Sequence, residues 1–485
     1  MKILMVSSEV IPYAKTGGLA DVTGTLPSAL KKLNHEVRVV MPKYKSIDFG
    51  RTKPIKVIEK YPINFGAQKE FCTIYEGKRD DGVIFYWIEN DNFFGRRGLY
   101  GGEKGDYKDN AERFAFFSLG AIEVIRRKLF TPDIIHIHDW QTSLIPVYLK
   151  NNFSKEKISK IPVVFTIHNI SYQGIFEKKV MPVIGLDRSL FTTDKLEFYG
   201  KLNILKGGIL FSDYITTVSP TYASEILTKE FGVGLEGVLK IRKKNLTGIL
   251  NGIDYKLWNP GSDKFIRYAF SPKMLGGKLL NKSYLERKLN LEKDINKPLL
   301  GMVSRLAEQK GLDIFAQILQ DIVEEDVHIV VLGKGDKIYE ELLKNIASKY
   351  PDKIKVRIGF DNELAHQIYA GSDMFLMPSR FEPCGLGQLI AFKYGTVPIV
   401  HSTGGLRDTV QEFSPDTLTG NGFVFDKYNS FSFLKAVRRA LRVFKSGKKW
   451  KRLVGNCMEL DFSWETSAKK YIKLYEKLLR KQEQT

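Results

Sequence analysis

The alternation of two residue patterns along the chain is the feature that most constrains its fold. Short apolar runs rich in β-branched residues alternate with longer segments whose apolar residues recur at helical spacing. The first unit of this kind comprises a strand at 2–7, a glycine-rich loop with a helix at 19–33, and a second strand at 35–42. Strands that alternate with helices form parallel sheets covered by those helices. The sequence therefore predicts the α/β class, built from βαβ units.

The second half of the chain repeats this alternation after a stretch of turn-forming residues. Asn-Gly, Asp and Asn-Pro mark turns within 247–260, which we interpret as an interdomain linker. A chain of 485 residues is also too long for one hydrophobic core. We therefore predict two doubly wound, Rossmann-like domains, 1–246 and 247–460, that open and close about the linker, followed by a charged amphipathic helix at 461–485. Further apolar runs predicted as strands are 83–89, 133–138, 161–168, 213–219, 297–304, 327–333, 353–359, 373–378, 396–402 and 421–426.

Composition excludes several classes of protein. Apolar residues make up 43% and charged residues 27% of the chain, as in ordinary globular proteins, and no apolar run approaches the ~20 residues of a membrane span. The N-terminal apolar stretch contains Glu9 and lacks a small-residue cleavage site, so we interpret it as a strand rather than a signal peptide. Three scattered cysteines, Cys72, Cys384 and Cys457, give neither a disulfide framework nor metal-ligand spacing. These features predict a cytoplasmic protein with no membrane partner.

The formal net charge of +20 favours anionic ligands. However, the basic residues are spread along the whole length of the chain, as on a lysine-rich solvated surface. The sequence shows no compact basic run interleaved with aromatic residues, no helix-turn-helix pattern and no zinc-finger spacing. We therefore expect no nucleic acid among the partners.

Unusual loops follow several predicted strands, at the edge of an α/β sheet where ligands bind. The first is KTGGLAD at 15–21, in which Lys15 and two glycines precede a helix. Glycines allow close approach of a ligand, and the N–H groups and dipole of a helix N-terminus favour phosphate. A turn with a solvated lysine explains the loop equally well, because it is neither a GxGxxG fingerprint nor a Walker A motif.

Two histidine-containing loops follow the next strands. In HIHDW, alternation places His136 and His138 on one face of the strand, and Asp139 is positioned to contact a sugar hydroxyl or a developing positive charge. A metal site here is a minor alternative, because proximity of one His and one Asp more often means a hydrogen bond. In TIHN, His168 is either a sugar contact or a buried histidine that shapes the loop, with Asn169 next to it.

Three loops of the second domain carry the remaining signals. SRLAEQKG contains Arg305 and Lys310, a planar fork and a point charge suited to phosphate oxygens, although a solvated surface is the alternative. SRFEPCGLGQ places Glu382, a possible acceptor of sugar hydroxyls, before a glycine-rich helix start. STGGL at 402–406 again puts paired glycines after a strand. Together the loops are typical of a site for a nucleotide-sugar donor.

The ordered set of these motifs resembles bacterial glycogen synthase and plant starch synthase over nearly the whole chain. The motifs that carry the resemblance are KTGGLADV, HIHDWQ, TIHN with YQG, SPTYA, GILNGID with WNP, SRL with QKGLD, SRFEPCGL and STGGLRDTV. The resemblance implies the GT-B fold, two Rossmann-like domains facing across a cleft, with the C-terminal helix packing back on the N-terminal, acceptor-side domain. It also implies glycogen biosynthesis, by retaining, metal-independent transfer of glucose from ADP-glucose to the non-reducing 4-OH of an α-1,4-glucan.

The resemblance further implies roles for individual residues. Arg305 and Lys310 would neutralise the diphosphate as ADP leaves, as a metal does in other transferases, so no metal or cofactor is implied. His168 and Glu382 would hold the transferred glucose, and Asp139 would lie near the acceptor. The other implied substrate-binding residues are Lys15, Gly17 and Gly18 at the donor phosphates, Asp21 nearby, Tyr100 beside the adenine, and Asn169, Cys384, Gly385, Leu386 and Gly387.

The sequence departs from the family at one position of the site. Gly387 occupies the place of the usual threonine, which puts a hydroxyl contact to the phosphates in doubt and leaves the backbone N–H donors in place. For Cys384, loop packing is favoured over reactivity. The competing functions are a sucrose- or trehalose-forming transferase, a sugar-nucleotide epimerase, and a non-catalytic sugar-nucleotide sensor or glucan-binding scaffold. The residues alone identify no reader of the nucleotide base, so the expectation of ADP-glucose over UDP-glucose rests on the resemblance.

Overall fold

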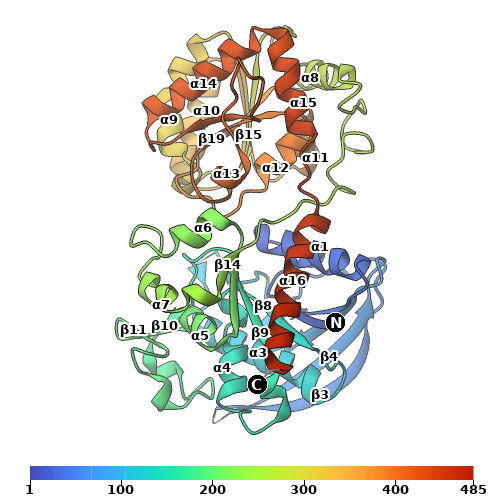
Figure 1. Cartoon of the computed structure of the whole chain (residues 1–485), viewed down its shortest axis with the longest axis vertical. Coiled ribbons are helices and arrows are strands. Elements are labelled where there is room, and N and C mark those ends of the chain that lie inside the picture. The colour runs from blue at the N-terminus through green and yellow to red at the C-terminus, as the bar shows by residue number, and fades with distance from the viewer. Residues whose placement is uncertain (67, 104, 484–485) are drawn as a thin grey trace. The chain divides into compact units, whose positions relative to one another are not determined.

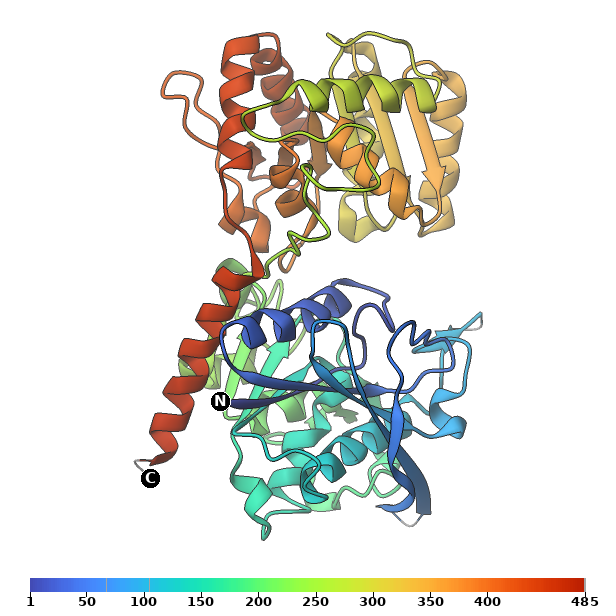
Figure 2. The ribbon, with the colours of Figure 1, turned by 90° about the vertical axis from the view of Figure 1, so that its right-hand side faces the viewer.

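The computed structural model describes residues 1–66, 68–103 and 105–483 and contains two compact units (Figures 1 and 2). Unit 1 consists of Met1–Ile249 together with Trp464–Thr485, and unit 2 of Leu250–Ser463. Each unit has its own sheet covered by helices. The predicted α/β class with two mainly parallel sheets is therefore confirmed. Within the described ranges, no helix has both the length and the apolar character to cross a bilayer.

The sheet of unit 1 is parallel in its larger part and antiparallel at one edge. Along the sheet the order is β14, β13, β9, β8, β1, β2, β5, β4, β3, and the pairs β5–β4 and β4–β3 are antiparallel. The strands in the middle are almost fully buried, which explains why they read as continuous apolar runs. The bounds are β14 (Leu246–Gly248), β13 (Tyr214–Thr217), β9 (Val163–Ile167), β8 (Ile134–His138), β1 (Lys2–Val6), β2 (Glu36–Pro42), β5 (Ile84–Glu89), β4 (Gln68–Lys78) and β3 (Ile55–Phe65).

Helices cover this sheet, and the last helix of the chain is one of them. Helix α16 lies against α1, and Figure 2 shows it running beside unit 1 (red beside dark blue). Helix α3 is buried along nearly its whole length. The bounds are α1 (Gly18–Lys32), α2 (Asp91–Phe94), α3 (Asn110–Arg126), α4 (Leu144–Lys150), α5 (Ile204–Phe211), α6 (Pro220–Glu225), α7 (Glu236–Ile241) and α16 (Trp464–Glu483).

Two small antiparallel sheets of unit 1 have no counterpart among the strands predicted from the sequence. One contains β10 (Ile175–Phe176), β12 (Lys201–Asn203) and β11 (Glu197–Phe198), in that order. The other pairs β6 (Gly101–Gly102) with β7 (Gly105–Asp106). These strands have two or three residues each, which is too short for alternation to be recognised in a sequence.

The sheet of unit 2 has the strand order of a dinucleotide-binding fold. The order β17, β16, β15, β18, β19, β20 reads 3-2-1-4-5-6 within the unit, and every pair is parallel. The direction of winding therefore reverses between β15 and β18, where ligands bind in such sheets. The bounds are β17 (Ile354–Ile358), β16 (His328–Gly333), β15 (Leu299–Val303), β18 (Met374–Met377), β19 (Val397–His401) and β20 (Phe423–Phe425).

The helices of unit 2 pack on both faces of this sheet. Helices α9 and α14 carry strongly amphipathic patterns and bury their apolar stripes in the main core of the unit. The bounds are α8 (Gly276–Lys288), α9 (Leu312–Glu324), α10 (Lys337–Lys349), α11 (Asn362–Gly371), α12 (Gly387–Lys393), α13 (Gly404–Thr409), α14 (Ser430–Phe444) and α15 (Gly447–Met458).

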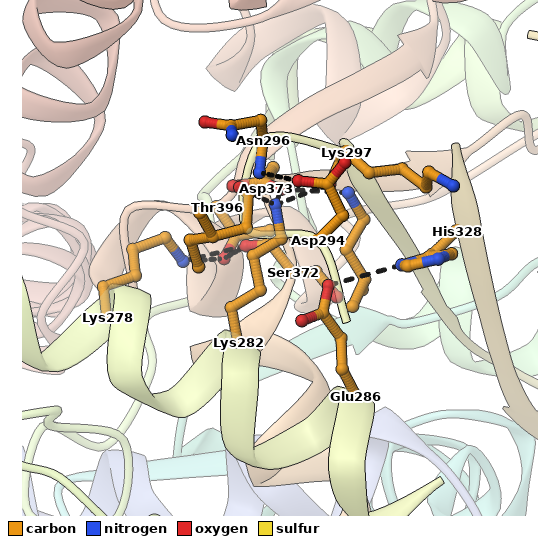
Figure 3. A network of polar contacts seen from close by, with 12 residues as sticks. Lys278, Lys282, Glu286, Asp294, Asn296, Lys297, His328, Ser372, Asp373 and Thr396 are labelled. Atoms are coloured by element: carbon orange, nitrogen blue, oxygen red, sulfur yellow. Dashed lines mark hydrogen bonds and ion pairs between the residues drawn. The ribbon is translucent and has the colours of Figure 1, made fainter. Parts of the chain in front are cut away.

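Helix α8 is unusual because its buried face is largely polar (Figure 3). Lys282 Nζ forms an ion pair with Asp373 Oδ2 at 2.7 Å, and both side chains are almost fully buried. Lys278 Nζ donates to the carbonyl of Ser372 at 2.9 Å and contacts Thr396 Oγ1 at 2.8 Å. Burial lowers the pKa of Lys278 to about 7. These lysines attach α8 to the segments that lead into β18 and β19.

Candidate active site

In unit 1, a buried carboxylate after β1 holds the glycine-rich loop at 15–18. Glu9, only 3% exposed, accepts hydrogen bonds from the amide of Thr16 at 2.5 Å and the amide of Gly17 at 3.2 Å. It also accepts from the Thr16 hydroxyl and the Tyr100 hydroxyl, both at 2.6 Å. Four uncharged donors therefore replace water around one buried carboxylate, which fixes the loop against the end of β1.

The predicted phosphate-binding residues of this loop remain close to solvent. Lys15 is exposed and its Nζ forms an ion pair with Asp21 Oδ1 at 2.7 Å. Gly17 precedes the first turn of α1, and a Cβ added there meets nothing within 4 Å. Because the amides of Thr16 and Gly17 donate to Glu9, an anion at this helix start depends on Lys15 and on the amides from Gly18 onward.

Asp139 connects the ends of β8 and β9. Its backbone has φ +55°, a strained value for a residue other than glycine, and its carboxylate accepts from the amide of His168 at 2.7 Å. Burial raises the pKa of Asp139 to about 7, against the lowering effect of the amides of His168 and Asn169. The structure thus brings together the predicted site residues of these two loops.

Three buried histidines continue inward from this edge. His168 Nε2 lies 3.0 Å from His138 Nδ1, and the rings of His138 and His136 lie 4.3 Å apart. His136 Nδ1 contacts the Tyr475 hydroxyl of α16 at 2.7 Å, and its Nε2 contacts Thr166 at 2.6 Å. Burial lowers the pKa of His136 and of His168 to about 3 and holds that of His138 well below its usual value, so all three are neutral near pH 7. In the described part of the chain, no three His, Cys, Asp or Glu side chains form a group suited to a metal ion.

In unit 2, the reversal point of the sheet carries the charged residues predicted for the diphosphate. Lys310 Nζ, in the loop after β15, pairs with Glu382 Oε2, in the loop after β18, at 2.6 Å. The Ser379 hydroxyl donates to the same oxygen at 3.0 Å. Arg305 is exposed and donates to Gln309 Oε1 at 2.9 Å. Two cations and one carboxylate therefore lie where parallel sheets of this order bind ligands.

The loop after β18 is shaped by a glycine and a glutamine, and it packs on the second glycine pair. Gly385 has φ +73°, and Gln388 Nε2 donates to the carbonyls of Cys384 and Gly385, each at 3.0 Å. A Cβ on Gly405 would lie 2.0 Å from the Cys384 carbonyl oxygen. The STGGL loop thus supports its neighbour by close packing. Burial raises the pKa of the Cys384 thiol to about 12, which agrees with a packing role for this cysteine.

Comparisons with known proteins agree across the whole chain. The profile of the starch synthase catalytic domain matches residues 2–241, and that of glycosyl transferases group 1 matches residues 286–452. The glycogen synthase of Geotalea daltonii is 48% identical over 482 residues, which cover 99% of each chain. The glycogen synthase of Koribacter versatilis is 47% identical over 478 residues, which cover 98% of each. The chain belongs to the glycogen synthase and starch synthase family. It is accordingly a glucosyltransferase of glycogen or starch synthesis.

Solved structures give the same result at the level of the fold. The catalytic domain of starch synthase IV from Arabidopsis thaliana, bound to ADP and acarbose, matches with a TM-score of 0.92 at 34% identity over 99% of both chains. A sucrose-phosphate synthase from Thermosynechococcus elongatus matches with a TM-score of 0.61 at 16% identity over 99% of both chains, which shows a shared fold only. The predicted GT-B fold is thereby confirmed.

The packing around Gly387 gives a physical reason for the departure from the usual threonine of glycogen and starch synthases. A Cβ at this position would lie 3.0 Å from Phe375 Cε1, 3.2 Å from Met377 Sδ and 3.3 Å from Tyr369 Oη. Each distance is shorter than a comfortable van der Waals contact. A side chain here requires these three neighbours to move, so the glycine matches its surroundings in this chain.

Sequence reasoning missed the residues that support the site. Glu9 was used only to argue against a signal peptide, although its position three residues beyond β1 is the signal that would have identified it. Ser379 and Gln309 lie within quoted motifs, but nothing in the sequence distinguishes them as partners of Glu382 and Arg305. Tyr475 lies 339 residues from its partner His136, and no local pattern relates the two.

Proposed function

We propose that the donor of this glycogen synthase-type enzyme is ADP-glucose and that Arg305 and Lys310 bind its diphosphate. The observation that carries the proposal is the Lys310–Glu382 ion pair at the reversal point of the unit 2 sheet, with Arg305 in the same loop after β15. The ADP bound to the related starch synthase supports the choice of nucleotide. Unit 2 is accordingly proposed as the nucleotide-sugar-binding domain and unit 1 as the acceptor-side domain.

The charges of unit 2 suit a leaving group that gains negative charge in the transition state. The bond between C1 of glucose and the diphosphate oxygen breaks, and its electron pair goes to that oxygen. Arg305 is exposed and its guanidinium donates to the uncharged Gln309 side chain, and Lys310 forms an ion pair with Glu382. Fixed cations at a developing oxyanion are worth several kcal/mol of transition-state stabilisation, on the order of 3–4 kcal/mol per group. These two side chains thus stabilise the negative charge on the leaving diphosphate, as a divalent ion does in other phosphate chemistry.

The groups of unit 1 suit recognition of uncharged sugar. His168 is neutral, so it contacts glucose as a hydrogen-bonding group rather than as an acid. Asp139 has a pKa near 7 and a strained backbone beside His168, properties that mark a functional carboxyl group. We propose that Asp139 lies near the acceptor and the reacting centre, and that His168 and Glu382 hold the transferred glucose.

Retention of the anomeric configuration is proposed to follow a front-face route. The departing diphosphate oxygen accepts the proton of the acceptor 4-OH while the new C1–O4 bond forms on the same face as the bond that breaks. Retaining glycosidases instead use a carboxylate nucleophile about 5–5.5 Å from an acid/base group. A glucosyl group trapped covalently on Glu382 or Asp139 would contradict the front-face route.

Further contacts of the donor phosphates and base are proposed from the resemblance to glycogen and starch synthases. Lys15, Gly17 and Gly18 would meet the phosphates with Asp21 and Asn169 nearby, and the main chain of Cys384, Gly385, Leu386 and Gly387 would supply further N–H donors. Tyr100 is proposed to lie beside the adenine. Its hydroxyl contacts Glu9 at 2.6 Å and Ser8 at 2.8 Å, so its ring rather than its hydroxyl is left for the base.

Radiolabelled donors test the proposal directly. The protein is incubated with glycogen and either ADP-glucose or UDP-glucose, both labelled in the sugar, and kcat/KM is compared. We expect label in the polymer and a clear preference for ADP-glucose. Label in a disaccharide would instead indicate a small-acceptor transferase, and no turnover would indicate a sensor or scaffold.

We also propose a cytoplasmic location. Its support is the relationship to bacterial glycogen synthases and three cysteines that are buried free thiols. Fractionation of the native host followed by immunodetection tests this, and recovery in a secreted or membrane fraction would contradict it.

A further inference from the structure

The ring of His168 is held by a second histidine, His138. His168 Nε2 lies 3.0 Å from His138 Nδ1, and His138 is completely buried. The main chain of His168 is fixed separately, because its amide donates to Asp139 Oδ1 at 2.7 Å. Two consecutive residues at the end of β8 therefore hold one residue of the loop after β9: Asp139 holds its main chain and His138 holds its ring.

His138 is itself fixed at both its main chain and its ring. Its amide donates to Thr142 Oγ1 and its carbonyl accepts from the same hydroxyl, both at 2.8 Å. Its ring lies against that of His136, with 4.3 Å between the centroids and 35° between the planes. The ring of His136 is in turn held by the Tyr475 hydroxyl at 2.7 Å. His138 therefore presents Nδ1 to His168 in one orientation.

Only one proton fits between the two facing ring nitrogens. Burial lowers the pKa of His168 to about 3 and holds that of His138 well below its usual value, so both rings are neutral near pH 7. A neutral imidazole has one N–H donor and one bare acceptor nitrogen. If His138 donates, His168 carries its own proton on Nδ1, whereas if His168 donates, its Nδ1 is bare. The contact thus decides which hydrogen-bond role His168 Nδ1 takes.

The second ring nitrogen of His138 favours the arrangement in which His138 donates. Among the residues that the structure describes, His138 Nε2 has no hydrogen-bond partner, although it is buried. A proton on Nε2 would leave a buried N–H donor without an acceptor, which is rarer in proteins than a buried acceptor without a donor. The proton of His138 therefore belongs on Nδ1, where it is donated to His168 Nε2.

His168 Nδ1 is left for a ligand. Within the described ranges, the contact with His138 is the only hydrogen bond of the His168 ring. His168 is 9% exposed, whereas His136 and His138 are 0% exposed, and its Nδ1 is not enclosed. A ligand that reaches this nitrogen therefore meets an N–H donor.

We propose that His138 is a positioning residue for the glucosyl transfer: its Nδ1–H keeps the proton of His168 on Nδ1, and this N–H donates to an oxygen of the transferred glucose. The inference rests on the proposed contact between His168 and that sugar. His138 acts through His168 and touches no substrate in this role. Because a sugar hydroxyl both accepts and donates, the tautomer of His168 makes the hydroxyl oxygen an acceptor and leaves the hydroxyl proton for another group.

Nitrogen NMR of the protein without any nucleotide sugar tests the tautomer directly. The chain has seven histidines. In protein labelled with ¹⁵N-histidine, a long-range ¹H–¹⁵N correlation spectrum at pH 7.5 distinguishes protonated from bare ring nitrogens. The signals are assigned by their loss in His168→Gln and in His138→Asn. We expect protonated Nδ1 and bare Nε2 in both His138 and His168. A proton on His168 Nε2 would overturn the inference.

Two uncharged substitutions test the positioning role by kinetics. His138→Asn places an amide N–H near the position of Nδ1, whereas His138→Leu fills a similar volume without a polar group. We expect kcat/KM for ADP-glucose to stay within about threefold of the parent in His138→Asn and to fall about tenfold in His138→Leu, as for the loss of one hydrogen bond. Equal losses in the two variants, or full activity in His138→Leu, would overturn the positioning role.

His328 provides a matched control in unit 2. It is also completely buried, its Nδ1 lies 3.3 Å from Glu286 Oε1, and its Nε2 has no partner in the described part of the chain (Figure 3). It begins β16, at the end of the strand opposite to the ligand-binding edge. His328→Asn is expected to keep the kcat/KM of the parent. A loss equal to that of His138→Leu would mean that burial alone explains the effect.

The outcomes are distinguishable from failure of the proposed function. Absence of transfer from ADP-glucose in the parent protein would overturn the donor assignment. The tautomer of His168 is measured without a donor, so that result would stand independently of the donor assignment.

Discussion

Unit 1 and unit 2 hold their candidate site residues by different kinds of interaction. In unit 1, apart from the solvent-exposed Lys15–Asp21 ion pair, the contacts are uncharged on one side: Glu9 accepts from amides and hydroxyls, and the histidines leading from His168 to Tyr475 are neutral. In unit 2, Lys310 pairs with Glu382, and a second buried ion pair lies under α8. The difference matches the ligands proposed for each unit: sugar hydroxyls are recognised by neutral donors and acceptors, and a departing diphosphate by fixed cations.

The largest expected effect concerns the cations of unit 2. Arg305→Ala and Lys310→Ala should each lower kcat about a thousandfold, because each removes positive charge where the leaving group becomes more negative. Initial rates with ADP-glucose and glycogen measure the loss. Arg438→Ala, which changes an exposed arginine paired with Glu325, is the matched control and should retain full activity. Full activity in both site variants would contradict the proposed role of these two cations in stabilising the leaving diphosphate.

The buried ion pair of α8 should show the next largest effect, on stability. Lys282→Ala leaves Asp373 buried without its cation, which should cost about 3 kcal/mol in the free energy of unfolding of unit 2. Native-state hydrogen exchange of β15 measures this. The double variant Lys282→Met, Asp373→Asn keeps an acceptor for the amide of Leu299 and should lose much less. Equal losses of unfolding free energy in the single and double variants would show that the unpaired charge of Asp373 is not the cause.

The corresponding change in unit 1 should be smaller and should not depend on charge. Glu9→Ala leaves the amides of Thr16 and Gly17 without their acceptor, which should raise KM for the nucleotide sugar about tenfold. Glu9→Gln keeps an oxygen for both amides and presents its NH₂ group to the Thr16 and Tyr100 hydroxyls, which rotate to accept. This variant should stay within about twofold of the parent. A severe defect in Glu9→Gln would mean that unit 1, too, relies on charge.

The smallest expected effect is a difference in acid sensitivity. The pKa values of His136, His138 and His168 are lowered from 6.5 by burial, so the unfolded chain binds more protons below pH 6.5 and stability is lost as the pH falls. Asp139 opposes this, because its pKa is raised from 3.8 to about 7 and the folded state binds more protons in between. Together, these three histidines and Asp139 contribute a net loss of roughly 0.5–1 kcal/mol to the stability of unit 1 between pH 6.5 and 6.0.

Unit 2 should respond less over the same pH range. The pKa of Lys278 is lowered from 10.5 to about 7, so its contribution to the free energy of unfolding changes mainly between pH 7 and pH 10.5. Burial also lowers the pKa of His401, a single histidine against the three fully buried ones of unit 1. Hydrogen exchange at pH 6.5 and 6.0, resolved by unit, measures the difference. Equal destabilisation of both units would contradict the neutral state of the unit 1 histidines.

The elements that could be predicted from the sequence are those specified by local patterns. Buried parallel strands such as β8 and β16 read as continuous apolar runs, and the charged loops behind β15 and β18 followed from the rule for sheet edges. The antiparallel edge strands β3 and β4 went unnoticed, because much of their surface is exposed or intermediate and their apolar residues do not form runs.

Two kinds of feature could not be predicted from the sequence: contacts between residues far apart in the chain, and a helix whose buried face is polar. Glu9 meets Tyr100, 91 residues away, and only the fold brings them together. Helix α8 buries Lys278 and Lys282 while Leu279 and Leu280 are more than half exposed. Hydrophobic periodicity therefore predicts the wrong buried face for this helix. The loops that carry the candidate site residues could thus be located from the sequence, and their supporting contacts could not.

The return of α16 to unit 1 has a consequence for biosynthesis. Tyr475 completes the contacts of His136, yet all of unit 2 lies between Ile249 and Trp464 in chain order. A ribosome adding 5–20 residues per second needs roughly 10–40 s to pass through that interval. During this time the surface of the nascent first unit that α16 later covers stays exposed, because the residues of that helix have not yet been synthesised.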